Sequence, residues 1–164
     1  MSTSFISPIQ LTQTEIIKLS FELLDDKPLE PGANVRVSLA HEFNDSLEQP
    51  ENDTIAGGCK LGVKFEIEGS SGSAAFTSEC MLWGVATIRL PDETSCVEEG
   101  LLASAWEALH VNLVSFLYST ARSVFEMVTQ HSPIGKQYLP AINPQEYLKT
   151  AVPAVAQPDK EEAK

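Results

Sequence analysis

The sequence predicts an α+β domain: a four-stranded antiparallel sheet packed by a long helix and a short C-terminal helix. Between residues 17 and 90, apolar and polar side chains alternate in several runs, which is typical of half-buried strands. Residues 101–131 follow a helical spacing instead and contain only three charged residues, Glu107, Arg122 and Glu126. Strands that precede the helices, without alternating with them, indicate the α+β class.

The first half of the predicted sheet lies in residues 17–43. After an uncharged arm of residues 1–14, the first strand runs over 17–23, with apolar and polar side chains on opposite faces. The second strand covers 35–39 and its alternation reaches on to Phe43. A polar, acidic stretch over 44–58 predicts a loop.

The second half of the sheet has the stronger signal. Residues 59–68 alternate strictly between apolar and polar side chains, and 69–72 form a Gly-Ser-Ser-Gly hairpin connection. The fourth strand runs over 75–90 and is apolar on both faces near its middle. Gly84 in that middle predicts a bulge or a close backbone approach.

The long helix shows two apolar lines where an ordinary surface helix shows one. The first line contains Leu102, Trp106, Leu109, Leu113 and Phe116 and continues to Val124 and Met127. The second contains Val114, Tyr118, Ala121, Phe125 and Val128. One line can cover the chain's own sheet, and the other then needs a partner. We assign the second line to an interface with another copy of the chain, although the residues alone leave open which line faces the sheet.

The end of the chain contains clear stop and start signals. Ser132 and Pro133 end the long helix, and an extended crossover follows over 133–142. Asn143 then stands at the N-cap of a short helix, with Pro144 in its first position and Glu146 completing a capping box.

Length and charge limit the function. The chain has 164 residues, enough for one domain, which we place at 1–152, followed by a flexible acidic tail at 153–164. The net charge of −12 argues against nucleic acid as a partner, because phosphate binding needs clustered basic side chains. Polar groups interrupt residues 101–121, so membrane insertion is not expected. The first residues do not resemble a signal peptide, and together with the odd cysteine count this predicts a cytoplasmic protein.

The residues that carry chemistry are scattered. His41, His110 and His131 share no metal-ligand spacing, and no phosphate-binding loop or nucleophile motif occurs. Cys59 and Cys80 stand at apolar strand positions, where cysteine is most simply a small buried side chain. We therefore expect a binding protein that uses no cofactor and no metal, and not an enzyme.

Several motifs, in this order along the chain, resemble the SecB-like chaperone family. Leu19–Glu22 resembles the first strand of the family, and Trp83–Ile88 resembles its fourth strand. Val114–Arg122 resembles the long-helix segment that ends in an Ala-Arg pair, and Tyr138–Pro144 resembles the entry to the second helix. The resemblance extends over residues 5–152.

The resemblance implies a chaperone that holds unfolded polypeptides, built as a homotetramer (a dimer of dimers) with the long helices in the middle. Apolar grooves would bind the clients. The matching client-binding positions are Val35, Val37, Leu39, Ile142 and Tyr147. On the chemistry of large apolar side chains alone, we add Trp83, Tyr138 and Leu139.

The family contains two groups of chaperones, which differ in their clients. Export chaperones pass preproteins to the SecA motor through acidic positions on the sheet, which Glu22 and Glu79 match here, although Lys18 stands where an acid is expected. Diverged relatives instead serve a single antitoxin of a toxin–antitoxin system. Two other classes of function remain as alternatives: an oligomeric scaffold without chaperone activity, and a carrier that holds a small apolar ligand between the sheet and the helix.

Overall fold

The computed structural model describes residues 9–24, 33–45, 54–69, 72–89 and 99–151. Its elements, in chain order, are the strands β1 (Ile9–Leu23), β2 (Val35–Asn44), β3 (Thr54–Glu68) and β4 (Ala74–Arg89), followed by the helices α1 (Glu99–Gln130) and α2 (Pro144–Thr150). The predicted α+β class is confirmed. The predicted tail at 153–164 and the domain boundary before it lie outside the described residues.

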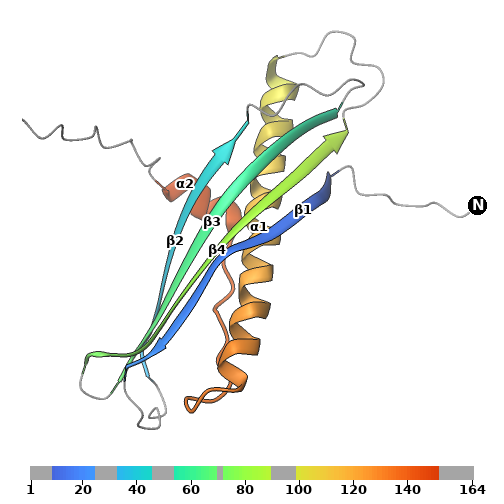
Figure 1. Cartoon of the computed structure of the whole chain (residues 1–164). Helices are drawn as coiled ribbons and strands as arrows, with labels where there is room; N and C mark the ends of the chain where they lie inside the picture. The colour runs from blue at the N-terminus through green and yellow to red at the C-terminus, as the bar shows by residue number, and fades with distance from the viewer. Residues whose placement is uncertain (1–8, 25–32, 46–53, 70–71, 90–98, 152–164) are drawn as a thin grey trace, which may run out of the picture.

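The four strands form one antiparallel sheet in the order β1-β4-β3-β2. The helix α1 runs along one face of this sheet and packs mainly on β3 and β4, the two central strands (Figure 1). The short helix α2 lies on the same side, behind β2. We call the face that α1 covers the inner face, and the opposite face the outer face.

Two strands begin earlier than the sequence pattern predicts. Residues 9–14, expected in an arm, belong to β1, which pairs with β4 from Ile9 onward. Residues 54–58, expected in a loop, belong to β3, where two glycines hide the strand signal. They are needed for close packing, since a Cβ at Gly58 would lie 2.4 Å from the ring of Trp83.

The core lies between the inner face of β3 and β4 and the helix α1. Phe125 of α1 packs against Phe65 and Phe76, with ring centroids 3.9 and 5.9 Å away. A Cβ at Gly84 would lie 2.8 Å from the side chain of Leu117, so this glycine makes room for a helix side chain, where the sequence predicted a bulge or a close backbone approach. These contacts hold α1 against the sheet along most of its length.

The assignment of the second helix line to a subunit interface is corrected by the structure. Val114, Tyr118, Ala121 and Phe125 are buried within one chain, in the same core as Leu109 and Leu113 of the first line, and Val128 packs against that core. The buried residues of the two lines together form one broad face that covers the sheet and the crossover. Met127, from the first line, is instead exposed. A contact between copies through α1 has to use the outward side of the helix.

Neither helix in the described part of the chain combines the length and the apolarity that a membrane span requires.

Candidate functional site

The crossover, residues 133–142, is held against the end of α1 by hydrogen bonds. The Tyr118 hydroxyl donates to the carbonyl oxygen of Pro140 at 2.7 Å, and the Gln137 amide donates to Oγ1 of Thr129 at 2.9 Å. Two crossover side chains, Ile134 and Leu139, are buried in the core. The crossover therefore brings α2 to a fixed position beside β2.

The helix α2 begins where the capping signals predict. Oδ1 of Asn143 accepts hydrogen bonds from the backbone amides of Gln145 and Glu146 at 3.1 and 3.4 Å. Pro144 occupies the first helical turn, and Lys149 stands in the last turn, where a cation is favoured by the helix dipole. None of the helix's side chains is fully buried, so its position depends on a few contacts to the rest of the chain.

One of these contacts joins α2 to β2. Nδ1 of His41 and the Tyr147 hydroxyl form a hydrogen bond of 2.8 Å, and the two rings meet edge to face. The pKa of His41 is lowered, mainly by burial and further by the nearby His110. The pKa of Tyr147 is raised, mainly by burial and further by Cys59. Both shifts favour the neutral forms, so this is a hydrogen bond between an uncharged imidazole and an uncharged phenol at neutral pH.

A second contact joins β2 to α1. The rings of Phe43 and His110 stack nearly parallel, with centroids 3.9 Å apart. Nε2 of His110 lies 2.8 Å from a carboxylate oxygen of Asp45, which follows β2, and the Trp106 ring lies next to His110 on α1. The aromatic and imidazole rings of these elements thus form one continuous cluster between the end of β2 and the first half of α1.

An open cavity of about 600 Å³ lies between this cluster and α2. Its walls combine aromatic and imidazole rings, aliphatic side chains and a few polar groups at the rim: His41, Phe43, Ala103, Trp106, Glu107, His110, Val111, Gln145, Leu148, Lys149 and Ala151. A cavity of this size and composition is typical of a site that takes large apolar side chains or a small organic molecule.

The structure brings together four of the eight client-binding positions that were predicted from the sequence. Val37, Leu39, Ile142 and Tyr147 are half-buried and pack on the edge of the core, from β2 on one side and from the crossover and α2 on the other. We give the name β2 groove to the surface between β2, the crossover and α2 that these four residues form; none of the four lines the cavity. Val35, at the start of β2, is exposed.

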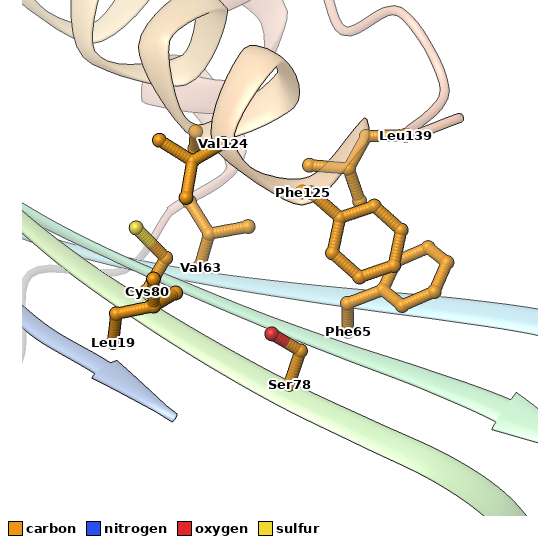
Figure 2. A pocket seen from close by; sticks show the side chains of 9 residues that line it. Leu19, Val63, Phe65, Ser78, Cys80, Val124, Phe125 and Leu139 are labelled. Carbon is orange, nitrogen blue, oxygen red and sulfur yellow. The ribbon is translucent and has the colours of Figure 1, made fainter. Parts of the chain in front are cut away.

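Three of the predicted positions differ from these. Tyr138 lies on the crossover with 62 % of its surface exposed and Lys136 above its ring. Leu139 is 2 % exposed and points with Phe125 toward Phe65 (Figure 2), so it supports the groove from within the core. Trp83 lies on the outer face, away from the groove, because successive strand residues point to opposite faces and Leu82 is the one that points inward.

The space between the sheet and α1 is almost completely filled. Figure 2 shows the side chains around one void there, which measures about 10 Å³ and is lined by apolar groups apart from Ser78. A void of that volume holds about one water molecule at most. Within the described residues, this void under the helix is therefore too small for the apolar ligand that the sequence suggested there.

Among solved structures, the chain is similar to a Mycobacterium tuberculosis SecB-like chaperone, Rv1957, in complex with a ChAD peptide from the Rv1956 HigA1 antitoxin. The TM-score is 0.53, with 13 % sequence identity over 82 % of this chain and 90 % of the other. The fold is SecB-like. The chain is also similar to a protein of unknown function from Streptococcus agalactiae, with a TM-score of 0.44, 15 % identity, and coverage of 81 % of this chain and 97 % of that one. No family model and no curated protein matches the sequence.

On the outer face of this SecB-like sheet, Glu22 and Glu79 lie on neighbouring strands, β1 and β4, as the sequence predicts. Their surroundings are not uniformly acidic. Nζ of Lys18 lies 2.6 Å from a carboxylate oxygen of Glu79, and Lys64 of β3 stands directly across from Glu79 in the sheet. Acidic and basic side chains are thus interleaved at this position.

None of the eleven residues that line the cavity was among the predicted client-binding positions. The large side chains among them are His41, Phe43, Trp106, His110 and Leu148. A signal existed for two of them, because the alternation of β2 continues through His41 to Phe43 and places both on the same face as Val37. No local pattern shows that Trp106 and His110 of α1 meet the far end of β2, since that contact depends on how the helix lies on the sheet.

Proposed function

We propose that this protein is a SecB-like holdase that binds unfolded segments of client polypeptides in the β2 groove and its cavity. The observation that carries the proposal is the cavity of about 600 Å³ between β2, α1 and α2 in a SecB-like fold, walled by half-buried aromatic and aliphatic side chains. Burial of client side chains there would contribute roughly 25 cal/mol per Å² of apolar surface. This mechanism needs no catalytic group and no cofactor.

For the client, we propose an antitoxin in preference to preproteins on their way to SecA. The structural neighbour binds an antitoxin peptide. Transfer of a preprotein to SecA would need an acidic outer face, yet Glu79 is ion-paired with Lys18 and lies across from Lys64. This mixed charge favours a dedicated client over a hand-off to a motor protein. A pull-down from cells of the source organism distinguishes the two, since either SecA or an antitoxin would co-purify.

We further propose that the chain assembles as a homotetramer, a dimer of dimers, and that β1 takes part in the contact. The inner-face side chains of β1 extend beyond the cover of α1, and five large apolar ones are between 37 % and 59 % exposed: Leu11, Ile16, Leu19, Phe21 and Leu23. An apolar strip of this kind marks an interaction surface. Light scattering should give a mass above that of one chain, and Phe21→Glu should lower it, whereas Ser20→Glu, on the outer face, should not. A monomeric wild-type protein would contradict the assembly.

The holdase activity is tested by suppression of the aggregation of a reduced, unfolded model protein. Val37→Asp places a charge in the groove and should raise the concentration needed for half-suppression about ten-fold, the equivalent of one lost apolar contact. Ser38→Asp, the neighbouring residue on the outer face, should leave that concentration unchanged. An oligomer that assembles normally but never suppresses aggregation would favour the scaffold function instead.

A further inference from the structure

The sheet has two edge strands, β1 and β2, and they differ in regularity. The pairing of β1 with β4 contains two register shifts, between Leu11 and Gln13 and between Ile16 and Lys18. The pairing of β2 with β3 runs without a shift from Val35 to Asn44. Bulges and lysine side chains protect an edge from unwanted pairing, while a long regular edge is a template for another strand. The edge of β2 is thus the better template of the two.

The backbone groups that face outward along β2 can be assigned from one hydrogen bond. The carbonyl oxygen of Asn34 accepts from the Glu68 amide at 3.0 Å, which makes these two residues a hydrogen-bonded pair. Such pairs alternate along an antiparallel ladder. The residues whose amide and carbonyl groups point away from β3 are therefore Val35, Val37, Leu39, His41 and Phe43. Among the described residues, no group forms a hydrogen bond with the outward backbone of Val37, Leu39 or His41.

The same residues also supply the side chains of the groove. Their partners on β3 are the buried, inner-face residues Ile67, Phe65, Val63, Leu61 and Cys59, so their own side chains point to the inner face as well. His41 and Phe43 continue this row into the wall of the cavity. One row of residues thus offers both unpaired backbone groups at the edge and apolar side chains in the groove.

We propose that a client binds as a fifth strand, antiparallel to β2, with its backbone paired to the outward groups of Val37, Leu39 and His41. This inference rests on the proposed holdase function and specifies its client: an extended segment with apolar side chains at every second position. Residues directly opposite each other in an antiparallel pair share a face, so the apolar side chains enter the groove and the largest fits the cavity. The intervening side chains face the solvent and are free to be polar.

The probe is a fluorescein-labelled peptide in which leucine, valine and phenylalanine alternate with threonine and serine, and its binding is followed by fluorescence anisotropy. N-methylation removes one amide donor at a time. At the apolar positions the peptide amide faces β2. N-methylation there removes one hydrogen bond to β2 and puts a methyl group in its place, so binding should become about ten-fold weaker. At the polar positions the amide faces solvent, and N-methylation should have little effect. A peptide of the same composition with helical spacing should bind weakly.

The protein side is tested by Val37→Pro. Its missing amide is one that points outward, so the ladder with β3 is kept, as is usual for proline at an edge strand. Val37→Ala is the matched control, because it also shortens the side chain but keeps the amide. Peptide binding should be about ten-fold weaker in the proline variant than in the alanine variant, with circular dichroism confirming that both fold.

The outcomes separate the inference from the function on which it rests. Equal effects of N-methylation at all positions, with tight peptide binding, would overturn strand addition while leaving the holdase function intact. No peptide binding together with no suppression of aggregation would overturn both. If Val37→Pro instead changes the oligomer mass and N-methylation has no effect, the edge of β2 pairs with a second copy, and strand addition by the client is wrong.

Discussion

The hydrogen bond between His41 and Tyr147 should be a measurable part of what holds α2 in place. Tyr147→Phe removes the hydroxyl and leaves the ring, which still meets the His41 ring edge to face. Both groups are neutral near pH 7, so charge assistance is absent and the bond should contribute about 1 kcal/mol to the free energy of unfolding. Because His41 is only half-buried, a water molecule can form a hydrogen bond with its Nδ1 in the variant. The loss in the free energy of unfolding should therefore not exceed about 1 kcal/mol.

A double-mutant cycle isolates the pair. His41→Phe keeps an aromatic ring beside Phe43, and together with Tyr147→Phe it should give a coupling energy between about 0.5 and 1.5 kcal/mol in urea unfolding at pH 7.5. Tyr138→Phe, at an exposed tyrosine, is the control and should change stability by less than about 0.5 kcal/mol. A coupling energy indistinguishable from zero would refute the role of this bond in holding α2.

Three further perturbations have defined outcomes. Gly58→Ala places a Cβ against the Trp83 ring and should cost about 1–3 kcal/mol in urea unfolding, and a second change, Trp83→Ala, should remove most of that clash cost. Asn143→Ala should cost about 1 kcal/mol and speed amide hydrogen exchange in α2, because the cap donors lose their acceptor. The lowered pKa of His41 means that the unfolded chain binds a proton more readily than the folded chain as pH falls below about 6.5. Stability measured by urea unfolding should therefore decrease between pH 7.5 and 5.5, and by less in His41→Gln.

The sequence pattern predicted most of the fold because the strands after residue 34 are half-buried on one face, and their side chains alternate accordingly. It failed where that alternation is absent for a structural reason. Residues 9–14 of β1 pair with β4, but only Ile9 and Leu11 among them are apolar, and the other four are Gln or Thr. The start of β3 contains two glycines that Leu109 and Trp83 pack against. In both places the strand is specified by its neighbours and not by its own side chains.

The candidate site was predicted only in part. The resemblance to the SecB-like family implied Val37, Leu39 and Tyr147, while strand alternation and helix capping predicted only the elements on which they lie. Trp83 looked equivalent by chemistry, yet one step along a strand exchanges the inner face for the outer. Trp106 and His110 could not be found at all, because nothing local to α1 shows which of its residues reach the end of β2.

The sequence suggested that α1 has few charged residues because it packs against two partners, the sheet and a second copy of the chain. The structure explains the lack of charge within one chain. Packing on β3, β4 and the crossover together buries a face broad enough to include residues of both apolar lines, so charged side chains are excluded from much of the circumference. What remains outward is mostly small and polar, including Ser115, Ser119 and Ser123 at four-residue spacing. Small side chains allow two helices to approach closely, but they bury little apolar surface. The larger apolar surface that one chain leaves exposed is on β1, around Phe21. If copies of this chain associate, the hydrophobic driving force for assembly should therefore come from β1, with the outward side of α1 fitting beside it.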